Sequence, residues 1–440
     1  MNDIVKWSYK TLDELQTDMD EHGVQFGVTE DFSPLKAPIT VGGIKLRNSM
    51  AVHPMEGNDS LPDGSPGELA FERYRRYAVG GAGMIWCEAI SCVEEGRSCP
   101  SQQWITERNV SKFRELIDTT IETYNSRFGA VPLLVAQLTH SGRYSKPHGP
   151  QSPLIAQRDP YTDDVHRFCK EIIPVSDEYL SRLEDKFADA AVLMKEAGFH
   201  AIDIKACHRY LISELLGAYE RPGIYGGSFE NRTRFLMNVV RKIRQKAGTG
   251  IILATRINIF DHTPYPHGYG VSRDDVQVPD YAEPIKLLRM LKDEGVQLAS
   301  LSMGNVKTWP LIGRLNGFPP LIHPLKNAER LINGIGAVSQ AIPDLCVVGV
   351  GYGYFRQYAP NVAAAVIADK KAQIAGLGRM SYACPEIFDD IMADRPIDKK
   401  KICVTCNKCV ELLKSGDPTG CVVRNPLYLS VYKKMKERLG

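Results

Sequence analysis

Four cysteines near the C-terminus have the side chains and the spacing to bind a metal centre. Cys403, Cys406 and Cys409 follow one another at three-residue intervals, and Cys421 comes after eleven further residues. Structural zinc usually takes two separated Cys-x-x-Cys pairs, whereas three close thiols and one distant thiol resemble iron–sulfur ligation. The spacing therefore favours an iron–sulfur cluster, which would transfer single electrons. Zinc is the alternative.

The remainder of the chain must position the site that receives those electrons, and its pattern alternates short apolar runs with amphipathic stretches. Strands are predicted at 50–52, 84–87, 133–137, 201–204, 251–256, 298–302, 346–349 and 373–376. Helices are predicted between several of them, at 110–126, 177–197, 230–247 and 280–294. This alternation predicts a (β/α)8 barrel with insertions. A doubly wound sheet is the alternative, but no Gly-x-Gly-x-x-Gly fingerprint follows an early strand.

In such a barrel the chemistry lies just after the C-terminal ends of the strands. The rule selects the residues at 53–56, 88–89, 137–140, 205–210, 256, 302–304, 349–353 and 378–379. The last two segments are glycine-rich and follow the seventh and eighth predicted strands, where barrels often bind phosphate through backbone N–H groups. Arg379 would add a bidentate, permanently charged contact to that phosphate.

The predicted organisation is an N-terminal arm over 1–36, a barrel over 37–395 and a cysteine-rich extension over 396–440. Apolar residues make up 43% of the chain and charged residues 24%, and the formal net charge is +2 without a long basic run, so nucleic acid is not an expected partner. No run approaches the ~18 apolar residues of a membrane helix, and the N-terminus lacks a signal-peptide pattern. The seven other cysteines suggest no disulfide framework, so a cytoplasmic location is expected.

Four motifs carry a family resemblance, and they occur in order at barrel spacing. They are the segments 135–143 (VAQLTHSGR), 197–211 (AGFHAIDIKACHRYL), 225–235 (YGGSFENRTRF) and 376–386 (GLGRMSYACPE). They resemble the Old Yellow Enzyme family of FMN-dependent NADH:flavin oxidoreductases, and more narrowly its 2,4-dienoyl-CoA reductase branch. The likeness covers about residues 37–426 and implies an FMN-dependent ene-reductase.

The resemblance implies a set of flavin-binding residues. Gln137 would hydrogen-bond the pyrimidine edge of the flavin, and Arg256 would lie near N1 and the C2 carbonyl, where a fixed cation stabilises the reduced anion. Glu56 would lie near the C4 carbonyl. Backbone groups of Pro54, Met55 and Ala89 would meet the ring, and the phosphate would be held by Gly351, Tyr352, Gly353, Gly378 and Arg379.

The resemblance also places substrate chemistry on Lys205, His208 and Tyr210. Two side chains of this loop would polarise the substrate carbonyl, the flavin N5 would deliver hydride to the β-carbon, and Tyr210 would protonate the α-carbon. Two residues depart from the family pattern, since Lys205 stands where many relatives have histidine and Glu56 where many have threonine or cysteine. We therefore expect Lys205 to donate to the substrate carbonyl or to a carboxylate, and Glu56 to be protonated or paired.

In the reductase branch a similar cysteine set holds a 4Fe-4S cluster that passes electrons from a FAD domain to FMN. The third spacing here is shorter than in that branch, and the sequence ends at Gly440 before any nucleotide-binding domain, so the expected donor is NAD(P)H or another protein. The expected substrate is an enone, enoate or enoyl thioester, and an oligomer is possible. The alternatives are an amine dehydrogenase or demethylase of the same family and a non-catalytic electron-relay subunit. A loop at 307–320, with Trp309, would cap the substrate or cover the barrel.

Overall fold

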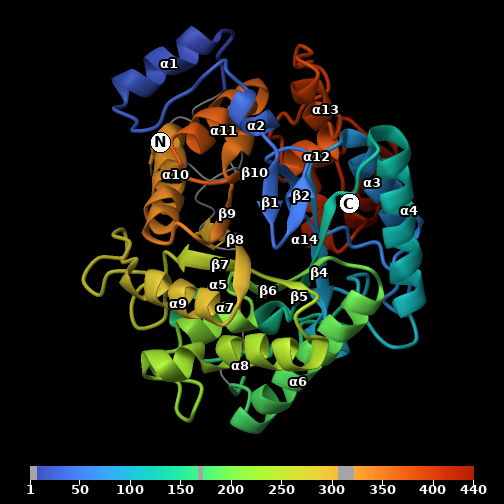
Figure 1. The fold of residues 1–440 in the computed structure, drawn as a ribbon. Helices are drawn as coiled ribbons and strands as arrows, with labels where there is room; N and C mark the ends of the chain where they lie inside the picture. The colour runs from blue at the N-terminus through green and yellow to red at the C-terminus, as the bar shows by residue number, and fades with distance from the viewer. Residues whose placement is uncertain (1–6, 167–171, 306–321) are drawn as a thin grey trace.

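The computed structural model describes residues 7–166, 172–305 and 322–440, so the predicted capping loop at 307–320 lies outside the described residues. Eight parallel strands close into a barrel in the order β10-β3-β4-β5-β6-β7-β8-β9 (Figure 1). They are β3 (Met50–Val52), β4 (Met84–Ser91), β5 (Leu133–Thr139), β6 (Ala201–Ala206), β7 (Ile252–Phe260), β8 (Val296–Met303), β9 (Cys346–Gly349) and β10 (Ile374–Leu377). The predicted (β/α)8 architecture is confirmed, and all eight predicted strands are present.

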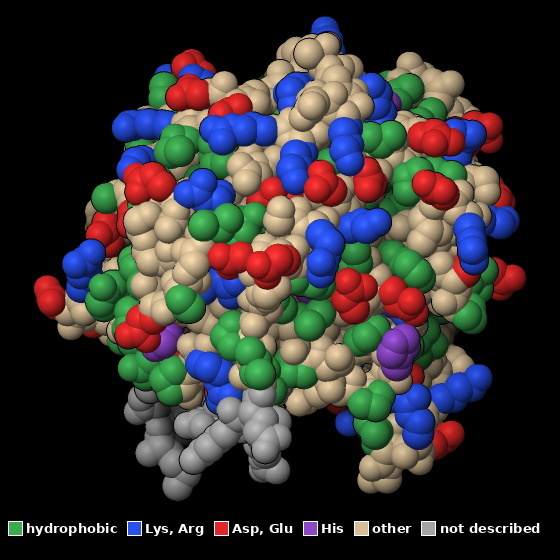
Figure 2. All heavy atoms as spheres, turned by 90° about the horizontal axis from the view of Figure 1, so that it is seen from below, with side chains coloured by type: hydrophobic (Ala, Val, Ile, Leu, Met, Phe, Trp, Pro, Cys, Tyr) green, Lys and Arg blue, Asp and Glu red, His purple; other side chains and the backbone are tan. Residues whose placement is uncertain are grey.

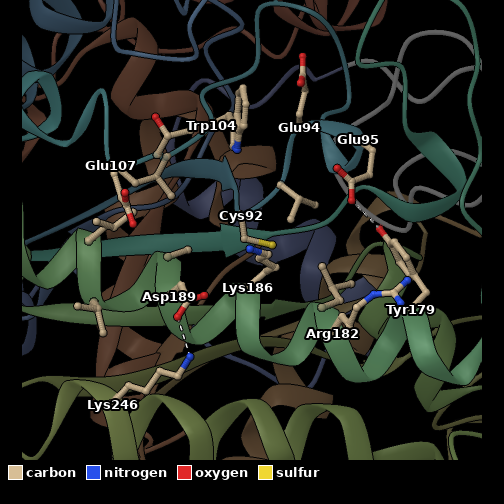
Figure 3. A pocket seen from close by; sticks show the side chains of 17 residues that line it. Cys92, Glu94, Glu95, Trp104, Glu107, Tyr179, Arg182, Lys186, Asp189 and Lys246 are labelled. Atoms are coloured by element: carbon tan, nitrogen blue, oxygen red, sulfur yellow. Dashed lines mark hydrogen bonds and ion pairs between the residues drawn. The ribbon is translucent and has the colours of Figure 1, made fainter.

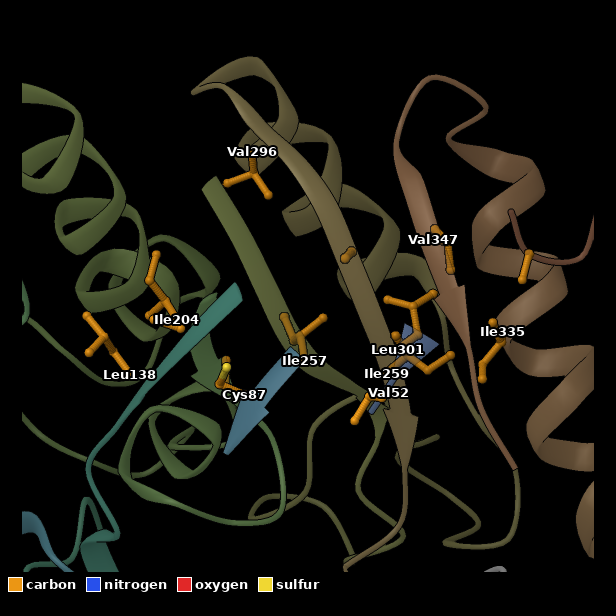
Figure 4. Close-up of a cluster of buried hydrophobic side chains, with 14 of the residues drawn as sticks. Val52, Cys87, Leu138, Ile204, Ile257, Ile259, Val296, Leu301, Ile335 and Val347 are labelled. Atoms are coloured by element: carbon orange, nitrogen blue, oxygen red, sulfur yellow. The ribbon is translucent and has the colours of Figure 1, made fainter. Parts of the chain in front are cut away.

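Helices return the chain from each strand to the next and cover the outside of the barrel. The main ones are α3 (Glu68–Gly80), α4 (Val110–Phe128), α6 (Asp177–Glu196), α8 (Phe229–Ala247), α9 (Ala282–Asp293), α10 (Pro324–Ala341) and α11 (Ala359–Ala368). Shorter helices lie in the connections: α5 (Pro160–His166), α7 (Leu211–Leu216), α12 (Arg379–Ala383), α13 (Ile387–Met392), η1 (Glu94–Gly96), η2 (Gly142–Tyr144) and η3 (Tyr352–Tyr358). Leu138, Ile204, Ile257 and Leu301 belong to the buried apolar cluster between strands and helices (Figure 4).

The strand pleat divides side chains between this outer layer and the barrel interior, because successive residues point to opposite faces. Leu133, Val135, Ala201 and Ile252 pack in an interior cluster, together with Trp86, Ala254 and Leu298. A hairpin of β1 (Ile39–Val41) and β2 (Ile44–Leu46) supplies Val41 and Leu46 to the same cluster. Its turn lies against the barrel, since a Cβ at Gly42 would be 2.4 Å from Cγ1 of Ile252. The hairpin therefore closes the end of the barrel opposite the predicted site.

Two further segments pack on the barrel. The N-terminal arm contains α1 (Leu12–Glu21) and α2 (Ser33–Lys36), and the extension contains α14 (Lys408–Ser415) and α15 (Pro426–Leu439). A small core of Leu412, Val422, Tyr428 and Met435 joins the last two helices. The N–H of Thr419 donates to the Gly57 carbonyl at 2.6 Å, so the extension reaches the loop that follows β3.

The surface of the molecule mixes charges. Figure 2 shows acidic and basic side chains interspersed over the face below the view of Figure 1. Ion pairs between neighbouring helices contribute to this mixture, for example Lys242 of α8 with Asp185 of α6 at 3.0 Å. None of the helices in the described ranges has the length and apolar character needed to span a membrane.

Candidate active site

A cavity of about 290 Å³ opens at the C-terminal ends of the strands, where the barrel rule places chemistry. Twelve of the fourteen residues predicted for catalysis or flavin binding line it: Pro54, Met55, Glu56, Gln137, Lys205, His208, Tyr210, Arg256, Gly351, Gly353, Gly378 and Arg379. The two others are buried next to lining residues. Ala89 pairs with Gln137 in the sheet and its carbonyl accepts from Nε2 of Gln102 at 3.0 Å, and Tyr352, between Gly351 and Gly353, is only 1% exposed.

The pleat explains how three of these side chains reach the cavity. Gln137, Lys205 and Arg256 point to the same side of their strands as the apolar residues of the interior cluster beneath them, so they form a polar upper layer inside the barrel. Strand pairing sets Lys205 beside Arg256 and Gln137 beside Asp203. The register therefore places the Gln137 amide and the Lys205 and Arg256 cations at the mouth of the barrel.

Asp203 lies beneath this layer and orients it. Its Oδ2 accepts from Nε2 of Gln137 at 2.6 Å and from the Trp86 indole at 2.8 Å, and its Oδ1 accepts from the backbone N–H of Arg256 at 2.6 Å. Burial raises the pKa of Asp203 to about 6, against the lowering effect of these hydrogen bonds. Because Asp203 takes the amide nitrogen of Gln137, the amide oxygen remains for a ligand. The sequence did not identify this role, since Asp203 reads as an ordinary strand residue.

The cation of Arg256 is suited to an electron-rich ligand edge. Its Nε is buried and has no hydrogen-bond partner among the described residues. Nearby, Nε2 of His53 lies 2.8 Å from the Ser300 hydroxyl, and burial, assisted by Arg256, holds the pKa of His53 well below its usual value. The guanidinium N–H of Arg256 is therefore available to a ligand, and the role predicted for Arg256 at flavin N1 stays a prediction.

Glu56, Lys205 and Tyr210 form a connected group on the cavity wall. Nζ of Lys205 lies 3.0 Å from Oε1 of Glu56, and the Tyr210 hydroxyl donates to the same oxygen at 3.0 Å. The Lys205 ammonium also lies 4.0 Å from the centre of the Tyr210 ring. Burial and the Glu56 carboxylate raise the pKa of Tyr210 well above its usual value. The two residues that depart from the family pattern therefore compensate each other's charge.

The loop that carries His208 has a left-handed backbone, with φ of 65° at His208 and 59° at Arg209. Such angles are uncommon for residues other than glycine and require support. The fully buried Arg209 supplies it, because its guanidinium pairs with Asp159 at 2.7 Å and donates to the His267 carbonyl at 2.7 Å. Nε2 of His208 in turn lies 3.3 Å from the Ser302 hydroxyl on β8.

The predicted phosphate-binding side of the cavity is built from the loops after β9 and β10. Gly351 has a φ of 105°, which favours glycine, and a Cβ at Gly353 would lie 3.9 Å from Nη2 of Arg379. Nη1 of Arg379 donates to Oδ1 of Asn407 at 2.8 Å. Asn407 lies between two of the predicted metal-binding cysteines, so Arg379 contacts both the cavity and the extension.

The four predicted metal-binding cysteines gather beside this arginine. Burial raises the pKa of Cys409 to about 12; Arg379 lowers it, while the Cys403, Cys421 and Cys406 thiols raise it. A sulfur in this group already accepts a backbone hydrogen bond, from the N–H of Thr405 to Sγ of Cys403 at 3.4 Å. Helix α14 begins within the group, and its residues Val410, Leu413 and Lys414 form one wall of the cavity.

The spacing of the sulfurs bears on which centre they fit. A zinc ion holds thiolates at about 2.3 Å in a tetrahedron, so its sulfurs lie about 3.8 Å apart. Within the described ranges, the group of three potential ligands whose atoms all lie within 4.8 Å of one another contains no cysteine. No three of these thiols lie within 4.8 Å of one another, so they are not gathered at the spacing of a bound zinc ion.

A larger hollow of about 820 Å³ lies outside the barrel, between the segment after β4 and helix α6. Figure 3 shows Cys92, Tyr179 and Arg182 on its walls, with Lys246 paired to Asp189 at 2.7 Å. None of the predicted site residues lines this hollow. Its size therefore does not make it the reaction site.

The class of protein to which this barrel belongs is given by comparison with known proteins. Residues 34–302, more than half of the chain, match the NADH:flavin oxidoreductase / NADH oxidase family, and the chain belongs to this family. Its fold is similar to that of an Old Yellow Enzyme homologue from Zymomonas mobilis, with a TM-score of 0.64 at 20% identity, over 89% of this chain and 98% of that chain. The predicted family is confirmed.

Two curated relatives are similar over most of the chain. The N,N-dimethylglycine/sarcosine dehydrogenase of Chromohalobacter salexigens is 25% identical over 404 residues, which cover 89% of this chain and 53% of the relative. The cinnamate reductase of Clostridium sporogenes is 24% identical over 417 residues, which cover 90% of this chain and 58% of the relative. The chain therefore spans somewhat more than half the length of these two proteins, of which one is a dehydrogenase and the other a reductase.

Proposed function

We propose that this protein is an FMN-dependent reductase of activated C=C bonds, acting on an enone, an enoate or an enoyl thioester. The observation that carries the proposal is the group of Glu56, Lys205 and Tyr210 on the wall of a cavity that also presents Gln137 and Arg256. FMN bound against Gln137 and Arg256 would supply hydride to the β-carbon of the substrate.

Tyr210 would supply the proton for the α-carbon. Because burial and Glu56 raise its pKa well above the usual value, the phenol keeps its proton at neutral pH and can act only as an acid. The Lys205 ammonium, 4.0 Å from the ring centre, would stabilise the phenolate that protonation of the substrate leaves. Glu56 already accepts a hydrogen bond from the Tyr210 hydroxyl at 3.0 Å, so it would lie on the path by which Tyr210 regains its proton.

Lys205 and His208 would bind the substrate carbonyl oxygen and polarise the conjugated bond. Both side chains are held before substrate arrives, Lys205 by Glu56 at 3.0 Å and His208 by Ser302 at 3.3 Å. Preorganised donors act most strongly in a cavity that excludes water. Lys205 can give one of its three N–H bonds to Glu56 and still donate to substrate.

Isotope labelling tests this division of roles. With NADH or NADPH deuterated at the transferred position as the direct donor, deuterium should appear at the β-carbon, whereas D₂O should label the α-carbon. When a carrier protein supplies single electrons instead, the hydrogen on N5 comes from solvent, and D₂O should label both carbons. Tyr210→Phe should lower kcat by about 10²- to 10⁴-fold without altering β-labelling, because general acids contribute that much. Tyr144→Phe is the matched control, since the ring centre of Tyr144 lies 5.9 Å from that of Tyr210 but Tyr144 does not line the cavity. Absence of deuterium from the β-carbon in both experiments would contradict the reaction.

Amine oxidation is the second candidate, because one relative is a dimethylglycine/sarcosine dehydrogenase. A carboxylate such as Glu56 would attract a substrate ammonium, but its pairing with Lys205 at 3.0 Å leaves the pair without net charge. The pocket therefore favours a neutral, carbonyl-bearing ligand. Bleaching of the oxidised flavin by N-methylated amines under anaerobic conditions would support this second candidate instead. Turnover by the isolated chain would exclude a purely electron-relaying subunit.

We further propose that Cys403, Cys406, Cys409 and Cys421 hold a 4Fe-4S cluster that supplies electrons to the flavin. The first support is that the other three thiols lie close enough to Cys409 to raise its pKa. The second is that a backbone N–H donates to Cys403, and the third is that Arg379, which lowers the pKa of Cys409, also contacts Asn407 beside the cysteines. An anaerobic visible spectrum with iron and sulfide analysis tests it, with about four irons per chain expected. Zinc without iron would refute the cluster and leave the proposed reduction of C=C bonds standing.

The charge of the extension bears on the electron donor. Residues 396–440 contain ten Lys and Arg against four Asp and Glu, a net charge of +6, whereas residues 1–395 carry 44 against 48, a net charge of −4. Such a concentration of positive charge would steer an acidic carrier protein toward the cysteines. NADH or NADPH acting directly on the flavin is the alternative donor.

Reduction by an acidic ferredoxin-type carrier, followed at increasing ionic strength, distinguishes these donors. The rate should fall with salt, and the double change Lys433→Glu with Lys434→Glu should slow it further. Lys45→Glu, on the hairpin at the opposite end of the barrel, should have no effect. Rapid reduction by NADH or NADPH, insensitive to salt and to these changes, would show that a carrier protein is not needed.

A further inference from the structure

A cluster of potential metal ligands lies far from the barrel mouth, where the N-terminal arm meets α10. Asp18 belongs to α1, His22 caps the C-terminal end of that helix, and His323 is the N-cap of α10. Each offers one ligand atom, and the three atoms all lie within 4.8 Å of one another. No part of the flavin or cysteine chemistry uses these residues.

The three side chains are already held close together. Nδ1 of His22 lies 3.2 Å from Oδ1 of Asp18 and 2.9 Å from the Asp18 carbonyl, one helical turn away, so the backbone fixes the orientation of the ring. The imidazoles of His22 and His323 stack with their centres 3.9 Å apart and their planes 17° apart, so the two rings are close together, and one must turn out of the stack for both in-plane lone pairs to reach the same ion.

The surroundings also resemble those of a cation site. The Tyr9 hydroxyl donates to Oδ2 of Asp18, and metal-binding carboxylates are usually oriented by such a second contact. The adjoining hollow, of about 550 Å³, is lined by the carboxylates of Asp13, Glu14, Asp18 and Glu21 and contains no Lys or Arg in its lining. A cation would therefore be attracted to this face of the arm, and the two imidazoles would select a transition metal over calcium or magnesium.

We propose that Asp18, His22 and His323 bind one divalent transition-metal ion, with Zn²⁺ the best match to two imidazoles and one carboxylate. Three protein ligands leave a fourth position for water. The ligands come from two segments about 300 residues apart, so the ion would fasten the arm to α10. The hydrogen bonds that already join these two segments include exposed ones, the Gln25 N–H to Glu329 at 2.7 Å and Lys326 to the Gly23 carbonyl at 3.3 Å. The buried side chains of Leu15 and Met19 pack the arm against the main core.

Zinc binding by matched variants tests the site. Wild type, His22→Ala, His323→Ala and the control His148→Ala, an exposed histidine elsewhere, are dialysed against buffered Zn²⁺ and analysed by mass spectrometry for zinc per chain. Any zinc on the cysteines is common to all four proteins and cancels in the comparison. Wild type and His148→Ala should bind one more zinc than either site variant, whose affinity should fall about 100-fold or more.

Limited proteolysis supplies a second readout that does not depend on counting metal. Zinc should slow cleavage within the arm, residues 7–32, in wild type and His148→Ala but not in the two site variants. Because His323 also caps α10, His22→Ala serves as the variant that leaves that helix intact. Equal zinc content in all four proteins would overturn the proposal, as would loss of zinc from His323→Ala alone with His22→Ala unaffected.

Discussion

The Glu56–Lys205 pair should be worth more to the protein than an ion pair on its surface. The Lys205 side chain is 3% exposed and that of Glu56 13% exposed, with their charged atoms 3.0 Å apart. Glu56→Gln keeps an acceptor for Lys205 and Tyr210 but leaves the buried ammonium without a counter-charge. Removing one partner of a buried pair costs roughly 3–5 kcal/mol, and the partial exposure of Glu56 places this case near 3 kcal/mol.

That free energy converts into a measurable shift of the unfolding temperature. With about 2.1 cal/mol/K per residue, the unfolding entropy of 440 residues is about 0.9 kcal/mol/K, so ~3 kcal/mol lowers Tm by about 3 °C. Lys205→Met should cost a similar amount. The double variant should be less destabilised than the sum of the two single variants by about 2–3 kcal/mol, because neither charge is then left alone.

Circular dichroism melts of the protein as purified provide the assay, accompanied by steady-state kinetics. Glu230→Gln is the control, because its pair with Lys286 is 3.2 Å long but both side chains are more than half exposed, and it should leave Tm unchanged. Strictly additive effects of Glu56→Gln and Lys205→Met, or an unchanged Tm in Glu56→Gln, would refute the argument that the two charges depend on each other.

Three further results are expected. Burial raises the pKa of Asp203 to about 6, so its contribution to stability is fully present below the unfolded value of 3.8 and is lost as pH rises through 6. In urea unfolding, the free energy of unfolding, taken relative to that of Asp203→Asn, should therefore fall by up to about 3 kcal/mol between pH 4 and 7. Arg379→Lys should weaken FMN binding about 10- to 100-fold in fluorescence titrations of the flavin-free protein, whereas Arg356→Lys, which contacts Thr405 rather than the cavity, should leave it unchanged. Cys421→Ser should lose most of its iron, and retention of the full iron content would contradict its assignment as a ligand.

The sequence was sufficient to predict the barrel because each strand is a short apolar run followed by a polar or glycine residue. The predicted strand ends were less accurate. β4 extends to Ser91 and β7 to Phe260, each several residues beyond the prediction, because Glu88 and Asn258 continue the strands as buried polar residues. A buried polar residue in a strand looks like the start of a loop until its partners are known.

The partners of such residues are what the sequence could not supply. Glu88 accepts a hydrogen bond from the Gly57 N–H at 2.6 Å, and Arg209 forms an ion pair with Asp159, which lies 50 residues earlier in the chain. These contacts depend on how distant segments meet after folding. The same holds for Asp203, whose three hydrogen bonds come from three different strands. Family motifs identified the residues that face the ligand but gave no indication of those that hold them in place.

Helix α14 serves two sites at once, because it starts among the cysteines and its Val410, Leu413 and Lys414 face the cavity. If the cysteines hold iron, the bound iron would fix the start of this helix and, with it, one wall of the cavity. A cell short of iron would then accumulate protein that also loses its flavin, because one side of the cavity would be free to move. The yellow colour of a preparation would in that case report the iron supply of the cells that made it.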